Sequence, residues 1–134
     1  MKKFLFIFIF FLIPSLVHAG PDGFLYKRWK YYYFQGRWAA KTDNPNKTQR
    51  ISMARETAIL EGKAKIAFYI DGLKMKKGGS VGEAKRNDEV MNKKISLILD
   101  GVGIVKTEWD DQDDCKVILK INRKSVLKAL KARE

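Results

Sequence analysis

The clearest alternation of hydrophobic and polar residues lies near the C-terminus. Residues 102–109 are one strand candidate, and the acidic stretch 110–114 that follows is a turn candidate. From Cys115 to Arg123 apolar residues alternate with polar ones, with Ile118 as the exception. A period of two predicts a half-buried strand. The inward positions are Cys115, Val117, Leu119 and Ile121, and the outward ones are Lys116, Lys120 and Asn122. Residues 102–123 are therefore expected to form a β-hairpin.

A second strand is predicted in the aromatic segment 24–38, because aromatic residues at such density favour a sheet. From Tyr31 onward, one face carries Tyr32, Phe34, Gly36 and Trp38. The opposite face carries Tyr31, Tyr33, Gln35 and Arg37, the mixed composition of a half-exposed sheet surface. The turn cluster at 42–46 is expected to end this strand.

A long helix is expected next, with Thr48 as its N-cap and its end at residues 70–72. Its inward positions recur at helical spacing: Ile51, Ala54, Ala58, Gly62, Ile66 and Tyr69. Three of these are small, and a stripe of small residues lets a helix approach its neighbour closely. Glycine inside a helix costs about 1 kcal/mol relative to alanine, so close packing at Gly62 is the natural compensation.

The rest of the chain predicts a glycine-rich basic loop and two further helices. The loop spans residues 73–87, one helix spans 88–99, and a basic helix runs from Lys124 to about Arg133. The expected fold is α+β, a small two-layer domain of order β-α-α-β-β-α. Its three-stranded, mainly antiparallel sheet is covered by the long helix, since three strands cannot bury an apolar face alone.

The first nineteen residues have the three parts of a secretory signal. Met1-Lys2-Lys3 is cationic, residues 4–13 are apolar, and Val17-His18-Ala19 offers small residues to a signal peptidase. We expect cleavage after Ala19, with a retained membrane anchor as the alternative. Residues 20–134 then form a single envelope domain in the periplasm or outside the cell. No cysteine lies near the cleavage site to accept a lipid, although outer-membrane association stays open.

Composition excludes several kinds of catalytic site. The chain has a formal net charge of +12, a single histidine, His18, and a single cysteine, Cys115. It therefore cannot build a Ser-His-Asp triad in its mature part, or the usual zinc site of several His and Cys ligands. The acidic turn 110–114 lacks the spacing of an EF-hand loop. We expect no enzyme activity, no metal and no cofactor, and we expect Cys115 to be buried.

Three segments together resemble a family of bacterial envelope proteins. They are the aromatic strand 31–38, the small-residue helix 53–64, and the segment 99–109 with its acidic turn and alternating strand. This combination resembles the LPP-twenty-type surface lipoproteins, a group that includes the flagellar protein FlgP and is similar to the N-terminal domain of FlgT. The resemblance implies a small non-enzymatic α/β envelope domain, often oligomeric and sometimes part of a ring around the flagellar motor. It supplies no ligand residues, and this chain lacks the family's lipidated cysteine.

The expected function is therefore that of a non-catalytic, periplasmic or secreted assembly or scaffold protein of the bacterial cell envelope, and the resemblance adds an association with the flagellum. Its partner would be an envelope or flagellar protein, or a second copy of the chain. The expected contact residues are Trp29, Tyr31, Tyr33 and Arg37. The alternative is a secreted cationic binder of an anionic polymer or an anionic lipid surface, because cations and aromatic rings are interleaved in residues 26–31. Its contact residues would be Lys27, Arg28, Lys30, Lys74, Lys76 and Lys77. A nucleic acid partner is not expected for an exported protein.

Overall fold

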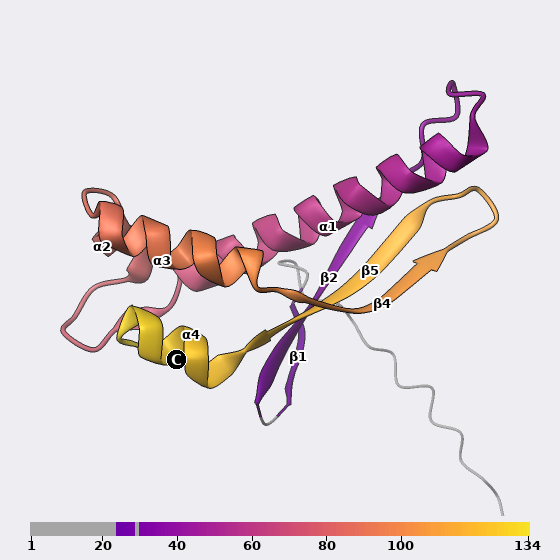
Figure 1. The fold of residues 1–134 in the computed structure, drawn as a ribbon. Helices are drawn as coiled ribbons and strands as arrows, with labels where there is room; N and C mark the ends of the chain where they lie inside the picture. The colour runs from indigo at the N-terminus through magenta and orange to yellow at the C-terminus, as the bar shows by residue number, and fades with distance from the viewer. Residues whose placement is uncertain (1–23, 29) are drawn as a thin grey trace, which may run out of the picture.

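A computed structural model describes residues 24–28 and 30–134, so the predicted signal and Trp29 lie outside the described residues. The fold is mixed α+β, with four helices and an antiparallel sheet in the described part of the chain (Figure 1). The main sheet has the order β1-β2-β5-β4. Its strands are β1 (Phe24–Arg28), β2 (Tyr31–Trp38), β4 (Gly103–Trp109) and β5 (Cys115–Asn122).

One long helix, α1 (Lys47–Asp71), crosses one face of this sheet and packs on β2 and β5 (Figure 1). The remaining helices gather at the far end of α1: α2 (Val81–Lys85), α3 (Glu89–Asp100) and α4 (Arg123–Leu130). A small second sheet joins β3 (Lys74–Met75) to β6 (Ala132–Arg133) beside them. Buried Met91, Ile95, Val126 and Leu130 extend the apolar core into this helical end.

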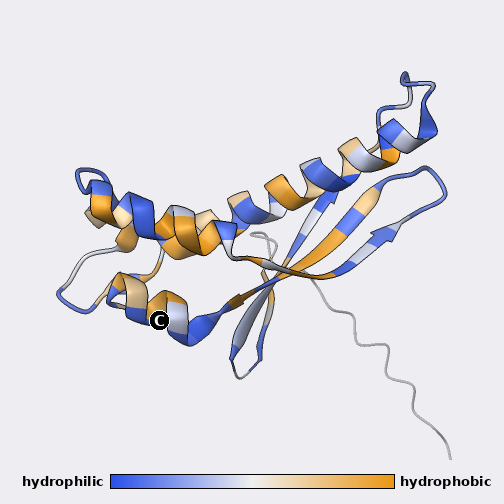
Figure 2. Cartoon of the chain, viewed as in Figure 1, coloured by the Kyte–Doolittle hydropathy of each residue, from blue (hydrophilic) through white to orange (hydrophobic). Residues whose placement is uncertain are grey.

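The predicted inward faces are confirmed by the strand register. Tyr32, Phe34 and Gly36 of β2 lie opposite Ile121, Leu119 and Val117 of β5, and all six are buried. Along β5, hydrophobic positions are interrupted by hydrophilic Lys116, Lys120 and Asn122 (Figure 2). On the helix, the buried residues are Ala54, Ala58, Gly62, Ile66 and Ile70. The expected small-residue stripe therefore does face the sheet.

The helix and the sheet meet most closely at two glycines. A Cβ atom on Gly36 would lie 2.0 Å from the carbonyl oxygen of Ala58 and 2.8 Å from the backbone nitrogen of Gly62. A Cβ atom on Gly62 would lie 2.7 Å from Cδ1 of Leu119. The absence of side chains at both positions is what lets the helix backbone rest on the strand.

The sheet has four strands where three were expected. The aromatic segment 24–38 is not one strand, because β1 folds back antiparallel on β2 and pairs Tyr26 with Tyr33 and Arg28 with Tyr31. The observed order is therefore β-β-α-β-α-α-β-β-α-β. Aromatic residues are dense in both strands, so composition alone did not indicate the turn that separates them.

Three boundaries also differ from prediction. Asn46, not Thr48, caps α1, because its side chain accepts a hydrogen bond from the backbone N–H of Gln49. The stretch 73–87 is not only a loop, since it holds β3 and α2, which Ser80 caps. The last helix ends at Leu130, because Lys131 takes a left-handed backbone conformation with φ of 50° that stops it.

Candidate binding surface

The sheet face opposite α1 is the first candidate surface. Side chains of a strand alternate between faces, so the residues between the buried ones of β2 point away from the helix. These are Tyr31, Tyr33, Gln35 and Arg37, and their β5 partners are Asn122, Lys120, Ile118 and Lys116. No described helix packs over this face (Figure 1), and its residues are half-buried or exposed. We call it the uncovered face.

Aromatic rings and cations are in direct contact on the uncovered face. The rings of Tyr31 and Tyr33 meet edge to face, with their centroids 6.3 Å apart. Nζ of Lys120 lies 4.6 Å from the centroid of the Tyr31 ring, within the range of a cation–π contact. At the end of β2, the backbone N–H of Arg37 donates to Oε2 of Glu61 on α1 at 2.8 Å, while the guanidinium stays exposed.

The uncovered face has a positive balance of charge. The neighbouring strand β4 adds Lys106 and Glu108, which its register places opposite Ile118 and Lys116. Glu108 binds Lys106 at 2.6 Å and Lys116 at 2.9 Å, and these two ammonium groups lower its pKa to about 2. Five cations (Arg28, which pairs with Tyr31, and Arg37, Lys106, Lys116 and Lys120) and one carboxylate give 5 − 1 = +4. The face therefore offers tyrosine rings within a field that attracts anionic groups.

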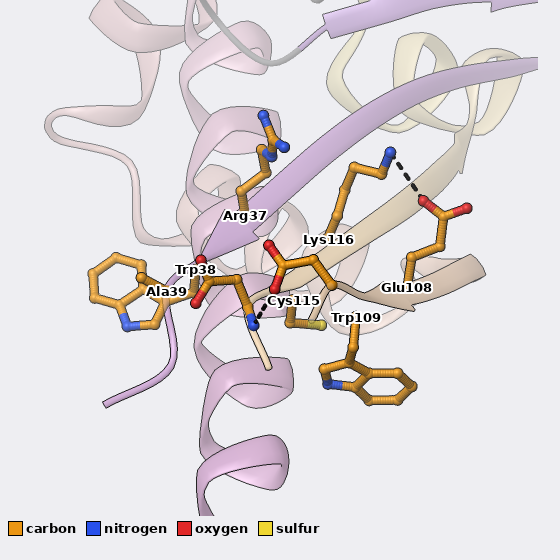
Figure 3. A pocket seen from close by; sticks show the side chains of 9 residues that line it. Arg37, Trp38, Ala39, Glu108, Trp109, Cys115 and Lys116 are labelled. Atoms are coloured by element: carbon orange, nitrogen blue, oxygen red, sulfur yellow. Dashed lines mark hydrogen bonds and ion pairs between the residues drawn. The ribbon is translucent and has the colours of Figure 1, made fainter. Parts of the chain in front are cut away.

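A groove of about 500 Å³ lies at the end of the sheet (Figure 3). Trp38, Cys115 and Trp109 lie side by side on β2, β5 and β4, and the two indoles are each nearly half exposed. The Cys115 thiol between them is buried, as predicted, and burial raises its pKa. Asp114 at the rim accepts a hydrogen bond from the backbone N–H of Ala40 at 2.8 Å. These partners give the groove apolar walls and a paired polar rim.

A second, more basic hollow of about 420 Å³ lies at the helical end of the molecule. Four lysines surround it: Lys76, Lys77, Lys94 and Lys131. Met75, Met91 and Leu130 also line it, and Asp88 is the one carboxylate among its lining residues. None of the four lysines forms an ion pair with the described part of the chain. We call this site the lysine hollow.

The structure brings together some predicted contact residues and separates others. Tyr31, Tyr33 and Arg37 share the uncovered face, whereas Trp29 lies outside the described residues. The cations of the alternative prediction divide into two groups. Lys27, Arg28 and Lys30 belong to β1 and its turn, and Lys27 is bound to Glu134 at 2.7 Å. Lys76 and Lys77 enter the lysine hollow, and Lys74 does not.

The sequence interpretation missed several residues of both surfaces. Lys116 and Lys120 were predicted to point outward, but only the register of β2 on β5 puts them beside the tyrosines. Lys94 and Lys131 come from segments that nothing in the linear pattern connects with residues 76–77. For Lys116 and Lys120, the alternation of inward and outward residues along β2 and β5 was the signal available in the sequence.

Comparisons with known proteins do not identify the function of either surface. The chain matches no known family model, and no curated protein or solved structure is significantly similar to it. In the described residues, no three His, Cys, Asp or Glu side chains are grouped so that they could hold a metal ion. Nor does any helix of that part have the length and apolar character needed to cross a membrane.

Proposed function

We propose that the protein is a non-catalytic assembly domain of the bacterial cell envelope and binds a protein partner through the uncovered face. One observation carries the proposal: a four-stranded sheet is covered by a helix on one side, and no described helix lies over the other side, where Tyr31 and Tyr33 are in contact. Tyrosine and arginine are enriched where proteins bind each other, because they combine large contact area with a polar group. The resemblance to the LPP-twenty-type proteins favours the same function, including the association with a flagellar motor.

The proposed location rests on the first nineteen residues. A cationic start, an apolar core and small residues before the cleavage position together favour export and cleavage after Ala19. The mass of the chain recovered from its native host tests this. Loss of residues 1–19 supports export to the periplasm or beyond, and an intact N-terminus recovered with membranes supports the retained anchor.

Site-specific photo-crosslinking in the native host tests the contact surface. A photoreactive phenylalanine analogue replaces Tyr33 in one strain and Ser96, an exposed residue of α3, in the control strain. We expect a discrete crosslinked protein of the envelope fraction from position 33 and none from position 96. Equal products from both positions, or none from positions 31, 33 and 37, would contradict the proposal.

A second candidate function is binding of an anionic polymer or an anionic lipid surface, and the lysine hollow favours it. Like charges gathered around one concave site raise the local concentration of anions. The site has four cations from three separate segments, around residues 76, 94 and 131. Lysines that release counterions on binding produce a steep dependence of affinity on salt.

Titration with inorganic polyphosphate and with phosphatidylglycerol vesicles tests this candidate. We expect the Lys76→Gln/Lys77→Gln variant to bind about tenfold more weakly and with a shallower salt slope. The matched control is Lys41→Gln/Lys47→Gln, which removes two exposed cations elsewhere. Binding of polyphosphate alone indicates a polymer site, and binding of vesicles alone a membrane surface. Equal losses in both variants would show general attraction to a basic protein and would contradict a specific site.

A further inference from the structure

The outer side of α1 carries an apolar stripe directly opposite the side that packs on the sheet. Leu60 and Phe68 are about two thirds exposed, and Met53 is 39% exposed. No described element lies over this side of the helix (Figure 1). Large apolar side chains that recur on one exposed side of a helix are typical of an interaction surface.

The spacing of this stripe is that of a coiled-coil seam. Positions 53, 57, 60, 64 and 67 are separated by four, three, four and three residues, and they hold Met, Thr, Leu, Ala and Ala. This alternation keeps one seam of a helix against a partner helix. The stripe from 53 to 68 spans about 22 Å at 1.5 Å per residue. Small residues at 57 and 64 leave room for Leu60 of a facing helix.

The charges beside the seam identify the partner and its direction. Glu56 and Lys63 are seven residues apart and so flank the seam on the same side. In an antiparallel pair of identical helices such flanking positions face each other. Glu56 of each copy then lies opposite Lys63 of the other, on both sides of a twofold axis near Leu60. A parallel pair would instead set Lys63 against Phe68 of its partner. It would set Glu56 against Glu61, whose carboxylate already binds Lys65 at 2.6 Å, so neither charge would gain an opposite partner.

We propose that two copies of this chain form an antiparallel dimer through the outer side of α1, with Leu60 at the twofold axis and Glu56–Lys63 ion pairs on each side. Neither charged group has an ion-pair partner within the described part of its own chain. One helix pair of this length buries less than the roughly 800 Å² per partner of a standard interface, so the dimer is expected at micromolar to millimolar concentration. The surface is separate from the uncovered face, and the sheet would remain open in the dimer.

Sedimentation equilibrium of the purified chain, measured up to millimolar concentration, tests the dimer. We expect Glu56→Lys and Lys63→Glu each to raise the dissociation constant about tenfold, because each change turns two attractive contacts into two repulsive ones. The double exchange Glu56→Lys/Lys63→Glu should restore it to near the original value. Asp111→Lys, in the exposed hairpin turn, is the charge-matched control and should have little effect. Leu60→Glu should abolish the dimer while the thermal unfolding midpoint shows that the monomer still folds.

Disulfide trapping tests the direction of the helices. Met53→Cys and Phe68→Cys chains, when mixed and oxidised, should crosslink with each other far more than either does alone, because residue 53 lies near residue 68 of the second copy. Preferential crosslinking of each variant with itself would indicate a parallel pair and overturn the proposal. A chain that stays monomeric at millimolar concentration, or a dimer that tolerates Leu60→Glu, would overturn it as well. None of these results bears on photo-crosslinking from position 33, which tests the uncovered face separately.

Discussion

The two faces of the β2–β5 ribbon are built from alternate residues of the same strands, yet they follow different rules. On the covered face, Tyr32, Phe34 and Gly36 are buried against α1. On the uncovered face, Tyr31, Tyr33 and Arg37 keep contact with solvent. On the covered face, the size of each side chain determines which residues fit, because the backbone of α1 packs against this face. On the uncovered face, where no described helix restricts side-chain volume, the chemical character of the residues matters more than their size.

Neighbouring tyrosines show the same difference. The hydroxyl of Tyr32 donates a hydrogen bond to Oε1 of Glu134 at 2.6 Å, and burial raises the pKa of this tyrosine well above its usual value. Tyr31 instead holds the Lys120 ammonium over its ring. One tyrosine therefore links the C-terminal residue to the core, and the other presents a cation and a ring to solvent.

The largest expected effect on stability comes from adding a methyl group to the covered face. Gly36→Ala would place a Cβ atom 2.0 Å from the carbonyl oxygen of Ala58, a backbone atom that cannot turn aside. We expect a loss of about 3 kcal/mol or more in the free energy of unfolding. Urea denaturation measures it, with Gly101→Ala as control, since a Cβ there would meet its nearest atom at 3.5 Å. Equal stability of the two variants would contradict the close approach of helix and strand.

A smaller loss is expected on the helix side of the same contact. Gly62→Ala gains about 1 kcal/mol of helix propensity, but its Cβ would lie 2.7 Å from Cδ1 of Leu119. Because that atom ends a flexible side chain, we expect a net loss of about 1 kcal/mol. Leu119→Val removes the clashing methyl group, so it should cost less in the Gly62→Ala background than in the parent chain. Additive effects in a double-mutant cycle would show that the two residues are not in contact.

Periodicity was sufficient to predict the covered face, because burial leaves a pattern in the sequence. The small stripe Ala54, Ala58 and Gly62 and the alternation of 115–121 both predicted contacts that the structure contains. The hairpin of β1 and β2 was missed, since two successive aromatic strands give the same compositional signal as one.

The candidate surfaces could be predicted only in part. Tyr31, Tyr33 and Arg37 follow from the alternation of a single strand. The lysine hollow does not, because Lys94 and Lys131 reach Lys76 through the packing of α3 and α4, which no local pattern encodes. Contacts between distant segments depend on the tertiary arrangement, whereas period and spacing report only on the local environment.

An effect of about 1 kcal/mol is expected where Tyr32 reaches the C-terminal residue. Arg123 lowers the pKa of Glu134 to about 2, with help from Lys27 and Tyr32. A depressed pKa stabilises the fold above the ordinary value of 4.5, and this contribution is lost as the pH falls from about 4.5 to 2. Solvent screens the partly exposed group, so Glu134→Gln should cost only about 1 kcal/mol at pH 7.

The difference between the parent chain and Glu134→Gln should therefore shrink as the pH is lowered through that window. Denaturation at pH 7, 4 and 2.5 measures it. The comparison with the variant is needed because Glu108, whose pKa is also lowered to about 2, makes the parent chain acid-sensitive in the same range. A difference that stays constant down to pH 2.5 would contradict the ion-pair contribution of Glu134.

The smallest effect on stability is expected on the uncovered face. Lys120→Met removes the ammonium above Tyr31 but keeps an unbranched apolar side chain on the strand, so the fold should lose about 0.5 kcal/mol or less. If this face exists to bind, the same substitution should reduce photo-crosslinking from position 33 severalfold while the unfolding midpoint hardly moves. Lys93→Met, which removes an exposed ammonium group from α3, is the control that should change neither. A loss of stability comparable to that of Gly36→Ala would mean that packing also constrains the uncovered face, and the contrast between the two faces would fail.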